Sequence, residues 1–149
     1  MRFLFSSVCL CLLLLTSVPA QGEVDYLARM AQESEIKAIA VVTAVKRMGS
    51  NRDGTFYQVT FKTVYGLTPY IPSPFVGGCK TYEFAWQQRS KDMVYFKPRK
   101  GQKVYVTVST NGGAITSYTL LSDRLESAIR HEPDRLAYHR GEASVRPEE

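Results

Sequence analysis

Between residues 36 and 121, short runs of β-branched and aromatic residues alternate with clusters of glycine, proline, asparagine and aspartate. This pattern is typical of strands joined by tight turns. The five strands that it predicts are Ile36–Arg47, Thr55–Tyr65, Lys80–Trp86, Lys103–Ser109 and Ala114–Leu121. The turns at Asp53-Gly54 and Asn111-Gly112-Gly113 can adopt the positive φ angles that hairpins need. We therefore expect the first two strands, and also the last two, to pair antiparallel.

The first predicted strand is apolar on both of its alternating faces. One face carries Ile39, Val41 and Val45, and the other carries Ala38, Ala40, Val42 and Ala44. Such a strand is either covered on both sides or curled so that each half faces a core in turn.

Helical patterns flank the strands. Asp25–Ser34 carries apolar residues at helical spacing, and a second helix is expected to begin at Asp123, which can act as its cap. Pro133 interrupts this helix, and the residues through Tyr138 are expected to form a further helical turn or two. The last nine residues, Gly141–Glu149, have little to bury and are expected to be disordered.

A small barrel is the most economical way for five short antiparallel strands to bury a core, since closure removes exposed edges. We therefore predict a mainly β fold with flanking helices: a five-stranded OB-like antiparallel barrel with an N-terminal and a C-terminal helix. An open five-stranded sheet with both helices packed on one face is the alternative.

Parts of this region resemble secreted netrin-like modules, a group that includes the tissue inhibitors of metalloproteinases and many bacterial exported proteins. The stretches that carry the resemblance are SEIKAIAVVTAVKR, YQVTFKTVYGL and FKPRKGQKVYVTV, within Glu33–Leu121. The resemblance implies an OB barrel with helices packed near the termini. The inhibitor members use an N-terminal cysteine, whereas Gln21-Gly22-Glu23 stands at that position here, so the resemblance implies the barrel and no functional residue.

The first twenty residues have the three parts of an export signal. Arg2 provides a basic start, Val8–Leu15 is an apolar run, and Val18-Pro19-Ala20 is a small-residue cleavage site. The apolar run is shorter than the roughly 20 residues of a membrane span, and no later segment comes close. We therefore expect cleavage near Ala20 and a mature chain that is secreted or periplasmic, with no transmembrane segment.

Cleavage at that point leaves 129 of the 149 residues, which suits a single domain over residues 21–140. The formal net charge of +5 falls to +4 with the loss of Arg2, an ordinary value that indicates no partner by itself. Cys9 and Cys11 leave with the signal, so Cys79 is the one cysteine expected in the mature chain. An intramolecular disulfide is therefore not expected.

Cys79 is the main candidate for catalysis. A thiolate nucleophile needs a nearby base or positive charge, which His131, His139 or the adjacent Lys80 could provide. No family signature surrounds Cys79, and we interpret it as a structural thiol in a protein that is not an enzyme. A small cysteine-dependent enzyme or redox protein is the alternative. The two histidines are eight residues apart and share no helix face, so neither a metal nor another cofactor is expected.

The most distinctive segment is Gln87–Lys103, which contains six basic residues and one acid. Basic side chains beside aromatic rings can hold an anionic polymer, because charge attracts its backbone while rings stack on its bases or sugars. The candidate ligand-binding residues are Trp86, Arg89, Lys91, Tyr95, Lys97, Arg99, Lys100 and Lys103. The alternative is a solvated connection whose Tyr95 and Phe96 plug the end of the barrel.

A second candidate surface is the loop Gly66–Gly78, which contains three prolines. Proline limits rearrangement, so apolar residues displayed on such a loop are held ready for a partner. The candidate partner contacts are Tyr70, Ile71 and Phe75, which would otherwise cap the barrel. The sequence thus predicts an exported, noncatalytic binding domain. Its partner is an exported envelope protein or an anionic polymer, and nucleic acid is not expected in its natural setting.

Overall fold

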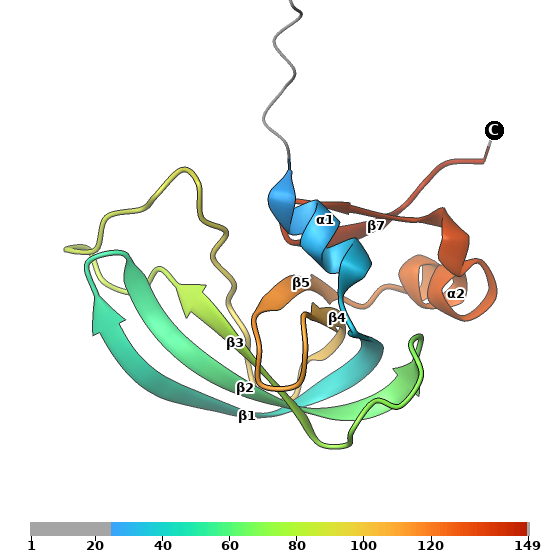
Figure 1. Cartoon of the computed structure of the whole chain (residues 1–149), viewed down its shortest axis with the longest axis horizontal. Helices are drawn as coiled ribbons and strands as arrows, with labels where there is room; N and C mark the ends of the chain where they lie inside the picture. Colours follow the sequence, from blue (N-terminus) through green and yellow to red (C-terminus); the bar gives the residue numbers. More distant parts are fainter. Residues whose placement is uncertain (1–24, 149) are drawn as a thin grey trace, which may run out of the picture.

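The structure is a computed structural model that describes residues 25–148 (Figure 1). The predicted signal segment lies outside the described residues. The elements in chain order are α1 (Tyr26–Glu33), β1 (Ile36–Asn51), β2 (Gly54–Gly66), β3 (Phe75–Thr81), β4 (Lys103–Val108), β5 (Ile115–Leu120), α2 (Asp123–His131), the 3₁₀ helix η1 (Pro133–Arg135), β6 (Leu136–His139) and β7 (Glu142–Val145). The fold is mainly β, as predicted. Within this part of the chain, no helix combines the length and the apolar character needed to cross a membrane.

Strands β1 to β5 form one antiparallel sheet in the order β3-β2-β1-β4-β5, and both predicted hairpins are present. The sheet is strongly curved (Figure 1), and its two edge strands meet at one parallel bridge between Gly78 and Ala114. There the Gly78 N–H donates to the Gly113 carbonyl at 2.9 Å. No longer ladder joins the two edges in the described residues, so the sheet is not closed into a barrel.

Two hydrophobic clusters lie on opposite faces of β1. The first joins residues from all five strands of the sheet, and its members include Ala38, Ala40, Val42, Phe61, Phe75, Cys79, Phe96, Val106 and Ile115. The second lies between β1, β4 and the C-terminal elements, and it contains Ile39, Tyr105, Leu125, Ile129 and Ala143. Of the two alternatives for the first strand, coverage on both faces holds only through Val42, because Ile39 and Ala40 belong to different clusters. From Thr43 onward its residues are exposed except for half-buried Val45.

The third strand lies earlier in the chain than predicted. It is Phe75–Thr81 rather than Lys80–Trp86, and its ladder with β2 pairs Phe75 with Phe61 at one end. Residues 82–102 contain neither a helix nor a strand. Of the alternating aromatic residues that suggested a strand, Phe84 and Trp86 stack with 5.7 Å between their ring centroids, and Tyr82 packs edge-on against Tyr95.

The C-terminal segment also differs from the prediction. The helical turn after Pro133 ends at Arg135, and β6 and β7 then pair as an antiparallel hairpin, so residues 142–145 are not disordered. The hairpin turns at Arg140-Gly141, where φ is positive at both residues, 46° and 84°. This turn docks on the sheet, because the Tyr118 N–H donates to the Gly141 carbonyl at 2.9 Å.

Candidate anion-binding site

The predicted basic segment runs as an extended connection from β3 to β4, and its middle is fixed to the edge of the sheet. The Phe96 N–H donates to the Lys80 carbonyl at 3.0 Å, and Thr81 Oγ1 donates to the Phe96 carbonyl at 2.7 Å. The Phe96 ring is buried in the first cluster. Of the two residues expected to plug the end of a barrel, Phe96 is buried beneath the sheet, whereas Tyr95 is half-buried and its hydroxyl bonds to Ser90 and Asp53.

A groove of about 620 Å³ lies beside this segment. Its walls are the segment itself, the end of β5 and the β6–β7 turn, and its three basic residues are Lys97, Arg99 and Arg140. All three are exposed. No acidic oxygen among residues 25–148 lies within 4.0 Å of their side-chain nitrogens, although Glu142 also lines the groove. With three cations against the single acid Glu142, the groove lining has an excess of positive charge.

Asp25, at the start of α1, fixes the turn that carries Arg140. Its Oδ2 accepts the Arg140 backbone N–H at 2.9 Å and lies 3.2 Å from His139 Nδ1, while its Oδ1 accepts the Ala28 N–H at 2.9 Å. Burial raises the pKa of Asp25, but the two backbone hydrogen bonds and the charges of His139 and Arg140 together hold that pKa below its usual value. Asp25 thus remains a carboxylate at neutral pH and keeps the turn beside the groove.

The inner wall of the groove is an aromatic ring with a neutral hydroxyl. Tyr118 packs at 6.4 Å from the Phe61 and Phe96 centroids and donates its hydroxyl to Gln102 Oε1. Burial raises the pKa of Tyr118 to about 12, against a smaller opposing effect of a hydrogen bond with the Arg99 backbone. The phenol is therefore uncharged at neutral pH. A ring below exposed cations suits an anionic ligand that also has a flat or sugar-like face.

The structure divides the candidate ligand-binding residues among several places. Those that line the groove are Tyr95, Lys97 and Arg99. Lys91 lines an adjoining hollow of about 610 Å³, which Arg140 also lines. Lys100 is exposed just before β4 and does not line the groove. Lys103 lies apart and pairs with Glu126, with 3.6 Å between Nζ and Oε1.

Trp86 and Arg89 lie beside the β1–β2 turn and do not line the groove. The loop that carries both residues is bonded directly to this turn, because the Gln88 N–H donates to the Arg52 carbonyl at 2.7 Å. Trp86 is 60% exposed, and the Arg89 guanidinium lies 5.8 Å from the centroid of the Tyr95 ring. The predicted ligand-binding set therefore does not form one surface.

The three candidate partner contacts of the proline-rich loop are displayed unequally. Tyr70 is fully exposed and has a positive φ of 59°. Ile71 is half-buried against the first cluster. Phe75 is fully buried and stacks on Phe61 with 5.0 Å between centroids, so its prediction as a displayed contact is wrong. The reason is that Phe75 begins β3 and points into the core.

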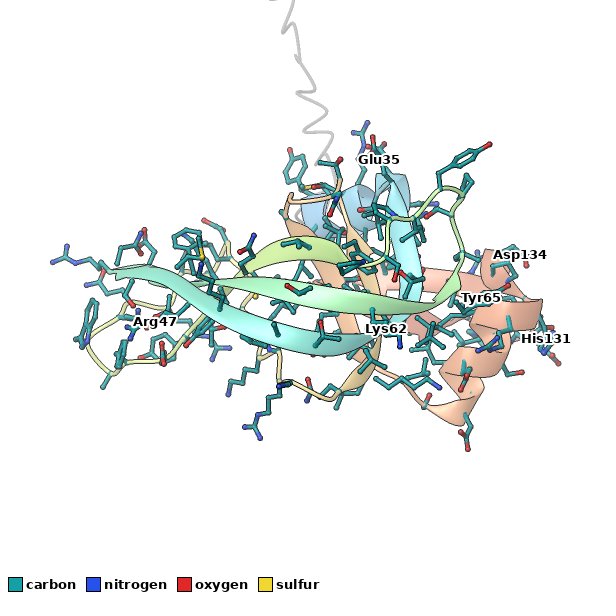
Figure 2. All side chains as sticks on the ribbon, turned by 90° about the horizontal axis from the view of Figure 1, so that it is seen from below. Glu35, Arg47, Lys62, Tyr65, His131 and Asp134 are labelled. Atoms are coloured by element: carbon teal, nitrogen blue, oxygen red, sulfur yellow. The ribbon has the colours of Figure 1, made fainter. Side chains whose placement is uncertain are left out.

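Cys79 is a buried thiol on β3 and forms no disulfide within the described residues. Burial raises the pKa of Cys79 to about 12, against a smaller opposing effect of a hydrogen bond with Thr81. The two histidines have other surroundings: His139 faces Asp25, and His131 ends α2 at the far side of the sheet from Arg47 (Figure 2). Cys79 is therefore a protonated thiol at neutral pH.

In the folded protein, Cys79 is expected to react slowly with a thiol reagent. A rise of the pKa from 9.0 to about 12 leaves roughly a thousandfold less thiolate at neutral pH, and burial restricts access further. The rate with an aromatic disulfide reagent should rise to that of a free thiol when the chain is unfolded in denaturant. A native rate equal to the unfolded rate would contradict this result and favour the cysteine-dependent alternative.

Comparison of the chain with protein-family models, with curated proteins and with solved structures finds no match. The function is therefore inferred from the geometry of the molecule itself.

Proposed function

We propose that the chain is an exported, noncatalytic domain that binds an anionic ligand in the groove lined by Lys97, Arg99 and Arg140. The observation that carries the proposal is the convergence of these side chains from two distant segments of the chain without an acidic partner within the described residues. A groove lining with three cations against the single acid Glu142 attracts an anion. An anionic polymer, or an acidic segment of an envelope protein, has the required chemistry.

The architecture that we propose for this function is a nearly closed OB-like barrel of the netrin-like kind. The strand order β3-β2-β1-β4-β5 and the bridge between Gly78 and Ala114 support it, because extending that bridge into a ladder would complete a ring. Such a ring would present the basic segment and the β6–β7 turn on a rigid base. Export is supported by the signal pattern of residues 1–20.

Heparin is a suitable probe for the anionic ligand, and the double variant Lys97→Glu/Arg99→Glu tests the groove. We expect its affinity for heparin to fall more than about tenfold. The plot of log affinity against log salt should also become less steep, by about one unit of slope for each polymer-contacting cation that the variant removes. The measurement is a titration of the mature chain at several salt concentrations.

The matched control is Lys62→Glu/Arg124→Glu, which replaces one lysine and one arginine that are exposed and do not line the groove. Lys62 lies on the outer face of β2 (Figure 2). The control should keep most of its heparin affinity. Equal losses in the two double variants would show that net charge rather than the groove determines binding, and a flat salt dependence would exclude an ionic site.

A further inference from the structure

Exposed apolar side chains and several cations lie at the end of the β1–β2 hairpin. We call these residues the hairpin tip: Met48, Phe56 and Trp86, with the cations Arg47, Arg52, Lys80 and Arg89. Met48, Phe56 and Trp86 are 58%, 40% and 60% exposed. Figure 1 shows this end of the hairpin extending away from α2 and the β6–β7 hairpin. Phe56 lies on the outer face of β2 beside Lys80. The loop that carries Trp86 is instead bonded through Gln87 to Thr55, on the other face. Single exposed apolar residues are ordinary, but large ones exposed on both sides of one projecting end indicate a contact surface.

A buried glutamine holds Trp86 in its exposed position. Gln87 is only 3% exposed, and its side-chain amide uses both its oxygen and its nitrogen. Its partners are the N–H groups of Glu83 and Phe84 at 2.9 and 3.0 Å, the Asn51 carbonyl at 3.2 Å and Thr55 Oγ1 at 3.0 Å. Because this amide is fully hydrogen-bonded, the loop is fixed to the hairpin and Trp86 needs little further ordering on binding.

The hairpin tip is also basic. The Arg47 guanidinium lies 5.1 Å from the Phe84 centroid, and Lys80 Nζ lies 4.6 Å from the Phe56 centroid. Its cations are Arg47, Arg52, Lys80 and Arg89, and the nearby acids in the sequence are Asp53 and Glu83. In the part of the chain that the structure describes, none of these cations has an acidic partner within 4.0 Å. Apolar surface and unneutralised positive charge therefore occur together.

We propose that the hairpin tip docks on an anionic lipid surface, with Trp86, Phe56 and Met48 inserted among the headgroups and the cations beside the lipid phosphates. Tryptophan favours the membrane interface, and each nearby cation adds attraction to an anionic leaflet. A soluble polyanion would use the cations and stack on exposed rings, but it would leave Met48 in water, whereas a lipid surface takes up all three apolar side chains. The proposal is independent of the groove, because none of the tip residues lines it.

Trp86 is the only tryptophan in the chain, so its fluorescence reports directly on the hairpin tip. With vesicles of phosphatidylcholine and phosphatidylglycerol, we expect the emission of the mature chain to shift to shorter wavelength and to be quenched by brominated lipid. Partition into vesicles of phosphatidylcholine alone should be at least about tenfold weaker. No shift with the anionic vesicles, or an equal shift with both kinds, would overturn the proposal.

Variants locate the contact. Met48→Ser/Phe56→Ser should weaken partition into anionic vesicles about tenfold or more, because two apolar side chains no longer insert. Val64→Ser is the matched control, since Val64 is 46% exposed on the same hairpin but far from its turn, and it should leave partition unchanged. Circular dichroism checks that each variant is folded, and cosedimentation with vesicles measures the same partition without fluorescence.

The groove variant separates this proposal from the proposed function. Lys97→Glu/Arg99→Glu should lose heparin binding yet retain most of its partition into anionic vesicles. Loss of vesicle partition in that variant, with none in Met48→Ser/Phe56→Ser, would assign lipid binding to the groove and overturn docking by the tip. A shift of the Trp86 emission by heparin but not by vesicles would instead assign the tip to a soluble polyanion.

Discussion

Replacement of Phe61 by alanine is expected to lower the free energy of unfolding by about 3–5 kcal/mol. The Phe61 ring is fully buried, stacks on Phe75 at 5.0 Å and lies 6.4 Å from the Tyr118 ring. Because these rings belong to β2, β3 and β5, the three strands would have to move together to fill the cavity. The change should appear as a lower midpoint of urea unfolding with a similar slope.

The control for this variant is Phe56→Ala on the same strand. Phe56 is 40% exposed, so its truncation is expected to cost less than about 1 kcal/mol. The two variants remove the same atoms and differ in which face of β2 loses them. Comparable losses would contradict a core enclosed by the curved sheet.

Most of the sheet follows from the alternation of apolar residues, because alternation records which side of a strand is buried. Strands β1, β2, β4 and β5 lie close to their predicted bounds. Strand β3 was misplaced because its centre, Gly77-Gly78, resembles a loop in the sequence. Gly77 is needed there for a reason that only the tertiary structure shows: the Ile115 side chain of β5 approaches its backbone closely.

Bulges are a second feature that the sequence does not show. Val45 was expected on the same face as Ile39 and Val41, but it packs against the first cluster together with Val42. The register with β2 shifts between Val42 and Ala44, so the extra residue reverses the alternation from that point on. A pattern with strict period two cannot indicate where such a shift occurs.

The candidate site was only half predictable. Lys97 and Arg99 are close in the sequence and were found by composition, whereas Arg140 reaches the groove only because the β6–β7 hairpin docks there. The signal for that hairpin was present as two short runs, LAYH and EASV, on either side of Arg140-Gly141. Gln87 was missed because a polar residue in a loop gives no sign that it will be buried.

The seam between the two edge strands gives the second large expected effect. A Cβ at Gly77 would lie 2.6 Å from Ile115 Cγ1 and 3.2 Å from Val108 Cγ2, closer than packed carbons allow. Gly77→Ala is therefore expected to lower the free energy of unfolding by about 1–3 kcal/mol, because β3 and β5 must separate. The Gly78 amide, which bonds to Gly113 across this seam, should also exchange its hydrogen faster.

Gly49→Ala is the control for a glycine without neighbours, since a Cβ at Gly49 has no heavy atom within 4 Å. Its effect on the free energy of unfolding should stay within about 0.5 kcal/mol. The comparison also bears on the proposed barrel, because only a close seam makes an added methyl group costly. If both variants were equally stable and the Gly78 amide exchanged at an unchanged rate, the two edges would be loosely apposed, and the open sheet would be the better description of the fold.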